Sequence, residues 1–247
     1  MLEEVLSQAF WLGLAKIIGV NVILSGDNAV VIALAARSLP PRQQTQAIFW
    51  GAGAAIVLRI ILTLFAVALL TLPWLKLVGS VLLFWIGVKL LIPEDDDAEI
   101  EASEHLLSAI KTILIADLVM SLDNVIAVAA AAGGSVVLLI LGLAISIPLV
   151  IFGATLLIKL MERFPVIITV GAGLIGWVAG EMLVTDLALK DWLSSLGVAY
   201  KDDNPFIGGL SLELLAGAVG VAIVVVLGKW FARKKELAAE ATPRPNS

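Results

Sequence analysis

The chain has 247 residues, of which 60% are hydrophobic and 15% charged, and its formal net charge is −5. A soluble domain cannot cover that much apolar surface with a polar exterior, so the composition indicates a protein that resides in the lipid bilayer. There is no cysteine, which excludes disulfides and thiolate-metal sites, and the one histidine is His105. No basic stripe is present, so we expect no nucleic-acid partner.

A helix that spans a bilayer needs about 20 mostly apolar residues. Seven stretches fit this length: Phe10–Ala36, Gln46–Thr71, Leu75–Ile92, Leu106–Ala132, Ser135–Leu160, Val166–Leu183 and Leu210–Phe231. We therefore predict an all-α membrane protein with one transmembrane domain over residues 1–232. The polar residues 233–247 are expected to form a disordered cytoplasmic tail.

Two connections between the predicted spans are long. Pro93–Glu104 is acidic, and we interpret it as a solvated connector. Thr185–Gly209 contains a short amphipathic stretch around Trp192. Glu3 and Glu4 do not form the basic region that a cleavable signal peptide requires.

Lysine and arginine near the helix ends predict the orientation. With seven spans, one side of the membrane carries Arg37, Arg42, Lys159, Arg163, Arg233, Lys234 and Lys235, and the other carries Lys76, Lys190 and Lys201. The positive-inside rule then places the C-terminus in the cytoplasm and the N-terminus outside.

The sequence contains an internal repeat. Ser25–Ala36, which begins Ser-Gly-Asp-Asn, reappears as Ser121–Ala132, which begins Ser-Leu-Asp-Asn. A Pro/Gly/Trp pattern follows in the same order in both halves. We predict two repeats of three spans, residues 10–92 and 106–183, with a seventh helix over 210–231. Because three is odd, the second repeat must be inverted relative to the first, which is typical of transporters whose site lies at mid-membrane.

Four charged residues lie well inside predicted spans: Asp27, Arg59, Asp117 and Asp123. A charge there costs roughly 2.5–3.5 kcal/mol even on the lenient insertion scale, and such residues usually mark sites or pathways. One arginine cannot neutralise three carboxylates, so a cation or protons should balance the surplus. The alternative is that each charge is half of a structural ion pair, with Arg59 holding one aspartate.

Helical spacing groups the polar residues. Asn21, Ser25 and Asn28 share one face of the first span, and Asp117, Ser121 and Asn124 share one face of the fourth. Asp27 and Asp123 lie off these faces on continuous helices. We therefore predict that both helices break at Ser-x-Asp-Asn, helped in the first span by Gly26.

The predicted ligands are all oxygens. Metal ligands would be Asp27, Asn28, Asp117, Asp123 and Asn124, with Arg59, Asn21, Ser25 and Ser121 lining the site. Such a hard set suits Mn²⁺, Mg²⁺ or Ca²⁺ rather than Zn²⁺ or Cu⁺. Lys89 and Glu181, at equivalent repeat positions, are interpreted as side chains that reach the membrane interface, with a gate as the alternative.

The chain resembles the TerC family of membrane proteins. The resemblance lies in Leu24–Ala29, Asp117–Asn124, Leu58–Ile60 and Gly176–Met182, and it covers roughly residues 10–232. It implies a seven-helix bundle with an inverted repeat that exports divalent metal, chiefly Mn²⁺, across the bacterial cytoplasmic membrane. Many members carry an acidic residue where this chain has Asn21, so the site implied here is less negative.

We expect an exporter working by alternating access, with the metal as transported substrate, no cofactor and no enzymatic activity. The alternatives are an exporter of a small organic cation or amino acid, an intramembrane aspartyl protease, and a metal sensor that does not transport. The protease is disfavoured because Leu24 replaces the first glycine of a Gly-x-Gly-Asp pattern. The sequence leaves open a homodimer and a contact with the secretion machinery.

Overall fold

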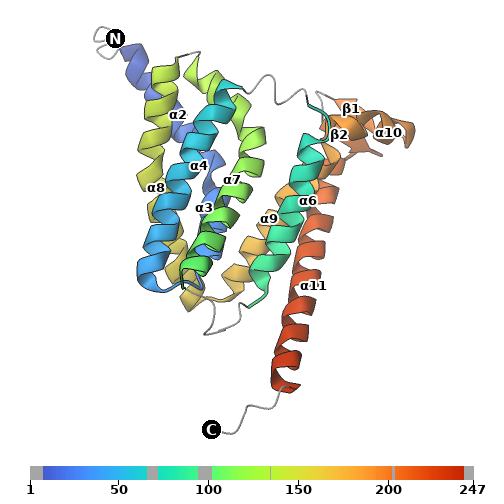
Figure 1. Ribbon diagram of the computed structural model, residues 1–247. Coiled ribbons are helices and arrows are strands. Elements are labelled where there is room, and N and C mark those ends of the chain that lie inside the picture. Colours follow the sequence, from blue (N-terminus) through green and yellow to red (C-terminus); the bar gives the residue numbers. More distant parts are fainter. Residues whose placement is uncertain (1–7, 66–71, 94–101, 134, 202–203, 242–247) are drawn as a thin grey trace.

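The structure, a computed structural model, describes residues 8–65, 72–93, 102–133, 135–201 and 204–241. Long helices that alternate in direction make up most of it (Figure 1). They are α2 (Gln8–Leu24), α3 (Gly26–Ala36), α4 (Pro41–Leu64), α6 (Leu75–Leu91), α7 (Ala102–Ala132), α8 (Val136–Arg163), α9 (Val166–Val184) and α11 (Leu212–Ala241). We call the end of the bundle where α2 begins the N-terminal end, and the end where α11 finishes the C-terminal end.

Five helices of the described residues, α4, α7, α8, α9 and α11, are long and apolar enough to cross a bilayer. The bent pair α2 and α3 makes a sixth span if it is counted as one. The remaining predicted span is α6, which has 17 residues and so lies at the lower limit of a spanning length. The protein is thus a multi-pass membrane protein, with five to six candidate spans among the described residues where the sequence predicts seven.

Helix α11 differs from the prediction at its end. It continues to Ala241, ten residues past Phe231, so the prediction of a disordered tail from residue 233 is wrong over 233–241. The reason lies in the composition, because Lys234–Ala241 consists of lysine, glutamate, leucine and alanine, which are strong helix formers. The first proline after them is Pro243, and residues 242–247 lie outside the described part.

The helices form two groups that lie side by side in Figure 1. Helices α2, α3, α4, α7 and α8 pack on one another and form what we call the polar bundle, because the buried charged network lies among them. Helices α6, α9 and α11 form a second group, the glycine bundle. Contacts of α3 with α9 and of α6 with α7 join the two.

Glycines set the spacing in the glycine bundle. A Cβ atom at Gly176 would lie 2.5 Å from the carbonyl oxygen of Gly220, and one at Gly180 would collide with the carbonyl of Ala216. The main chains of α9 and α11 therefore touch, as small residues allow between helices in a bilayer. The pair can separate or slide only by giving up this direct contact.

A small cap follows α9 at the N-terminal end. It contains η1 (Leu187–Leu189), α10 (Lys190–Ser195) and an antiparallel sheet of β1 (Ala199–Lys201), β2 (Asn204–Ile207) and β3 (Leu210–Ser211). The amphipathic stretch was predicted, whereas the sheet was not. Asp186 fastens the cap to α6, because its carboxylate accepts hydrogen bonds from the backbone N–H groups of Trp74 (3.0 Å), Leu77 (2.8 Å) and Ala188 (2.7 Å).

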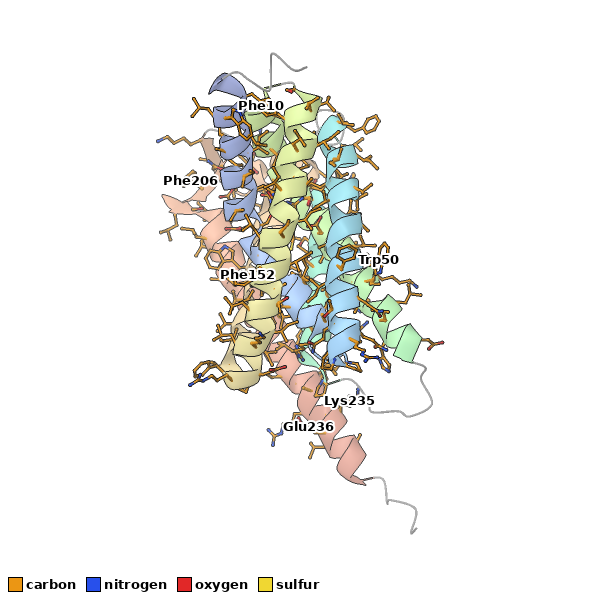
Figure 2. The ribbon with its side chains drawn as sticks, turned by 90° about the vertical axis from the view of Figure 1, so that its left-hand side faces the viewer. Phe10, Trp50, Phe152, Phe206, Lys235 and Glu236 are labelled. Atoms are coloured by element: carbon orange, nitrogen blue, oxygen red, sulfur yellow. The ribbon has the colours of Figure 1, made fainter. Side chains whose placement is uncertain are left out.

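The outer surface of the bundle is apolar. Trp50 on α4 and Phe152 on α8 point away from their neighbours in Figure 2, and both are largely exposed. Lys235 lies at the C-terminal end of α11 in the same view. An apolar belt with charges beyond it fits a bilayer and its water boundary.

Candidate cation site

The first membrane segment is bent at its Ser-x-Asp-Asn motif. Helices α2 and α3 meet at Ser25 with an angle of 50° between them. Ser25 has φ −106° and ψ 9°, outside the helical range, and Gly26 begins the next helix. Of the two helices expected to break, this one carries glycine inside its Ser-x-Asp-Asn motif.

Helix α7 differs at the equivalent motif. It runs as one helix from Ala102 to Ala132, so the predicted break at Ser121–Asn124 is not present. Leu122 stands where the first motif has Gly26, and leucine favours the helix by about 0.5 kcal/mol or more over glycine. The hydroxyl of Ser121 also donates to the Asp117 carboxylate one turn earlier, at 3.2 Å, which adds a contact within the helix.

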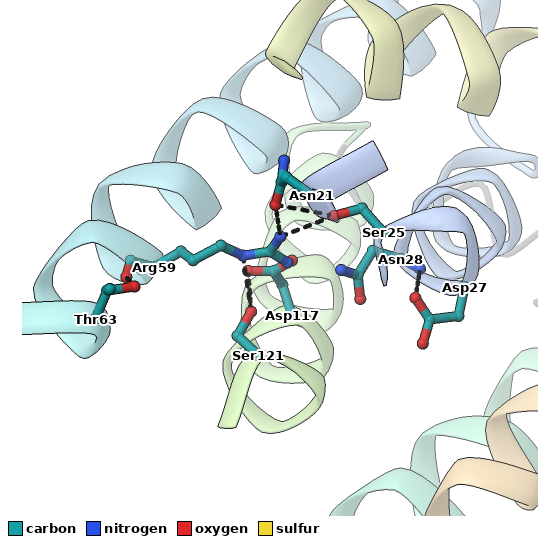
Figure 3. Close-up of polar contacts among 8 residues, drawn as sticks. All are labelled: Asn21, Ser25, Asp27, Asn28, Arg59, Thr63, Asp117 and Ser121. Carbon is teal, nitrogen blue, oxygen red and sulfur yellow. Dashed lines mark hydrogen bonds and ion pairs between the residues drawn. The ribbon is translucent and has the colours of Figure 1, made fainter. Parts of the chain in front are cut away.

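Arg59 of α4 is the centre of a buried polar network (Figure 3). Its Nη2 donates to Oδ1 of Asp117 at 2.6 Å, and its Nε donates to the hydroxyl of Ser121 at 3.0 Å. On the other side, its Nη1 donates to Oδ1 of Asn21 at 2.7 Å and to the hydroxyl of Ser25 at 2.8 Å. One guanidinium thus joins α7 to the bend between α2 and α3.

The ion pair is well shielded from solvent. The Arg59 side chain is 4% exposed and that of Asp117 is 8% exposed. The guanidinium neutralises this carboxylate, so the alternative in which Arg59 holds one aspartate describes the geometry found. Thr63 lies one helical turn after Arg59 on α4, and its hydroxyl donates to the backbone carbonyl of Arg59 at 2.7 Å.

Asn28 is the unpaired member of the group. It is 3% exposed, and neither its side-chain nitrogen nor its side-chain oxygen has a hydrogen-bond partner among the described residues. Figure 3 shows its amide on the side of α3 that faces Arg59 and Asp117. An unpaired buried amide costs about 1–3 kcal/mol, so a bound species that paired with its oxygen or its nitrogen would be stabilised there.

A small cavity lies beside this amide. It has a volume of about 20 Å³, and Asn21, Ser25, Asn28, Arg59 and Asp117 line it together with apolar side chains. That volume holds about one water molecule or one ion without its hydration shell.

Asp27 lies outside this arrangement. The Asp27 carboxylate accepts a hydrogen bond from the backbone N–H of Asn28 at 2.8 Å and lies on the far side of α3 from Arg59 (Figure 3). Asn124 is half-buried, and the side chain of Asp123 is not among those described. Among the described side chains, no three carboxylate or imidazole groups converge as a metal site would require.

Of the nine predicted site residues, the structure therefore brings together Asn21, Ser25, Asn28, Arg59, Asp117 and Ser121. Thr63 was not predicted, although its position one turn after Arg59 on the same helix was a usable signal. Asp186 was also overlooked as a buried carboxylate, because a loop position after a helix does not by itself indicate burial.

Comparison with known proteins defines the class. The family model described as "Integral membrane protein TerC family" matches residues 6–236, and the chain belongs to that family. The chain is 44% identical over 188 residues to "Uncharacterized membrane protein YjbE" of Bacillus subtilis (strain 168), which covers 76% of this chain and 86% of that one. No solved structure matches it.

Two other proteins of the same bacterium are more distant relatives. "Uncharacterized membrane protein YkoY" is 28% identical over 200 residues, covering 72% of this chain and 61% of that one. "Uncharacterized membrane protein YceF" is 25% identical over 193 residues, covering 74% of this chain and 75% of that one.

Proposed function

We propose that this protein exports a divalent metal cation, Mn²⁺ in the first place, across the bacterial cytoplasmic membrane by alternating access. The observation that carries the proposal is the buried cluster of Arg59, Asp117, Asn21, Ser25 and Asn28 at the bend of the first span. Its oxygens are hard ligands of the kind that Mn²⁺, Mg²⁺ and Ca²⁺ prefer. Export, rather than import, is the direction that the family resemblance implies.

Arg59 balances the charge of the cluster when no metal is bound. With no metal bound, its guanidinium neutralises Asp117 and fills the positions a cation would take among the oxygens of Asn21, Ser25 and Ser121. A metal ion that reaches Asp117 must displace the guanidinium. In the empty state Arg59 would balance the charge of Asp117, and in the loaded state the metal ion would balance it. The protein could then reorient in both states without an unpaired buried charge.

The pattern of contacts supports an inverted repeat. Asp117 and Ser121 are the counterparts of Asn21 and Ser25 in the sequence repeat, and both pairs are four residues apart on a helix. Arg59 binds both pairs through different nitrogens. Two equivalent pairs on either side of one group are what a site at a pseudo-two-fold axis would present.

In this proposal Asp27, Asp123 and Asn124 enter the ligand set when the helices move. Turning α3 about the bend at Ser25 would carry Asp27 toward the cavity, because Gly26 leaves the adjoining backbone free to rotate. The cavity of about 20 Å³ favours a metal ion over an organic cation or an amino acid. The site also differs from that of an aspartyl protease, because Asp117 faces an arginine instead of a second aspartate.

The orientation follows from the same bundle. The C-terminal end carries the predicted cytoplasmic charges, including Arg37 and Lys235, and α2 begins at the opposite end from where α11 finishes (Figure 1). We therefore place the N-terminal end outside and the C-terminal end in the cytoplasm.

Reconstitution tests the function directly. Purified protein in liposomes should move Mn²⁺ down an imposed gradient, and Asp117→Asn should abolish that flux. Glu213→Gln, in the first turn of α11 and away from the cluster, is the matched control and should transport normally. Wild-type flux in Asp117→Asn would show that the metal binds elsewhere, and a wild-type protein that moves no divalent metal would refute the function.

A further inference from the structure

The two sides of the cluster differ in how they are closed. On the C-terminal side, a cavity of about 390 Å³ opens between the ends of α3, α6, α7 and α11. Its lining includes Ala35 of α3 and Ser108, Ala109 and Thr112 of α7. We call this cavity the vestibule.

The vestibule reaches close to the cluster. Thr112 lies five residues before Asp117 on the same helix, which is about 7.5 Å along the axis. Ile113, the residue after Thr112, and Ile32 of α3 are both buried in one apolar cluster. The vestibule is not a second cation site, because the basic side chains of Arg37, Lys89 and Lys235 line it with the carboxylate of Glu104.

On the N-terminal side, an apolar layer covers the cluster. It consists of Ile17 of α2, Val128 and Ala132 of α7, and Leu139 and Leu143 of α8, all buried, with Ile56 and Ile60 of α4 packed against them. Four helices of the polar bundle, α2, α4, α7 and α8, contribute to it. Ile17 lies one helical turn, about 6 Å, from Asn21.

The layer is tightly packed at its centre. Ile17 lies directly against Gly142 of α8, where an added Cβ would collide with the isoleucine side chain. An ion cannot cross such a layer without losing its hydration, and nothing in the layer replaces the lost water. The layer must therefore part for any ion to leave by this end.

We propose that the apolar layer of Ile17, Val128 and Leu143 is the gate that opens toward the N-terminal end. The inference rests on the proposed transport function and adds a gate to it. Opening requires α2 and α8 to separate at Ile17 and Gly142, which the bend at Ser25 allows without moving α3.

Cysteine accessibility tests the proposal, because the chain contains no cysteine of its own. Single variants would be labelled with a membrane-impermeant thiol reagent in right-side-out and inverted vesicles. Exposed Ser195→Cys and Lys159→Cys report the N-terminal and C-terminal ends respectively, and so establish which end faces which compartment. Ser108→Cys should react from the C-terminal end only.

Val128→Cys should react on the order of a hundredfold more slowly than either surface control, because the reagent must wait for local opening. Val125→Cys, one turn closer to the cluster, reports whether the gate holds. It should stay unreactive from the N-terminal end alone and become reactive there when Leu143→Ala is added. Leu83→Ala removes an equally buried leucine from α6 and should leave Val125→Cys protected.

Rapid labelling of Val128→Cys from the N-terminal end, or of Ser108→Cys from that end only, would overturn the assignment. Equal exposure of Val125→Cys by Leu143→Ala and Leu83→Ala would also overturn it, since the layer would then be ordinary core. Thermal melting of each variant in detergent confirms that it is folded. If liposomes with the wild-type protein move no metal but the labelling results are as expected, the proposed transport function is refuted, whereas the closed apolar layer is supported.

Discussion

The polar bundle and the glycine bundle solve the same problem of packing helices in lipid in opposite ways. In the polar bundle, an arginine, an aspartate and an unpaired asparagine are buried beside a bend and a cavity. In the glycine bundle, α9 and α11 meet main chain to main chain at Gly176 and Gly220. Under the proposed transport function, we infer from this contrast that the first bundle rearranges and that the second is the fixed frame.

The largest effect should come from breaking the ion pair. Asp117→Asn leaves the Arg59 charge buried without a carboxylate, and removing one partner of such a pair costs about 3–5 kcal/mol. We expect a much lower melting temperature in detergent together with loss of Mn²⁺ flux.

The double variant Arg59→Gln with Asp117→Asn is the control for that experiment. It removes both charges, so most of the stability should return while transport stays absent. If the single variant melts like the wild type, another carboxylate holds Arg59 and the network is organised differently.

The next effect should come from the frame. Gly180→Leu forces a side chain into the main chain of Ala216, and overpacking of this kind costs about 1–3 kcal/mol or more. The melting temperature should fall. Gly53→Leu on α4, where an added Cβ meets no atom within 4 Å, should melt like the wild type. Equal melting of both variants would show that α9 and α11 are not held by their close contact.

A smaller effect is expected at the cap. Asp186→Asn keeps one acceptor oxygen but loses the second, so at least one backbone N–H at the start of α6 or η1 loses its partner. Losing a helix-capping contact costs about 0.5–2 kcal/mol. The melting temperature should therefore fall, while the Mn²⁺ flux per folded molecule should stay unchanged. Reduced flux at unchanged stability would instead connect the cap to transport.

The smallest effect on stability, and the most specific to the moving bundle, should come from Gly26→Ala. No atom lies within 4 Å of an added Cβ, and alanine favours the helix by about 1 kcal/mol. We expect equal or higher stability with slower Mn²⁺ flux, because the bend becomes stiffer. Gly19→Ala, with equal space in α2, is the control, and an equal slowing there would show that the bend has no special role.

Much of the fold could be predicted because hydrophobic length and turn residues dominate a membrane sequence. The starts of α6 and α9 and the ends of α3 and α7 agree with prediction to the residue. The helical faces of Asn21, Ser25 and Asn28 and of Asp117 and Ser121 were also predicted, because spacing alone determines them.

The structure differs from the prediction where short-range contacts determine the local conformation. Helix α7 stays continuous because Leu122 and the Ser121 hydroxyl both favour the helix, although its motif resembles that of the first span. Asp27 bonds to the adjacent backbone of Asn28, a contact that no periodicity reveals. The sheet of the cap consists of strands of two to four residues, too short for an alternating pattern to be recognised.

Arg59 has a consequence for the resting equilibrium of the protein. In a transporter built from two equal inverted halves, the states facing either side of the membrane would have the same free energy. The buried Arg59 of α4, and the neutral Asn21 opposite the charged Asp117, would make the two proposed halves chemically unequal. The empty protein should therefore favour one orientation at equilibrium, and an asymmetry of this kind gives an exporter an affinity that differs between its two sides.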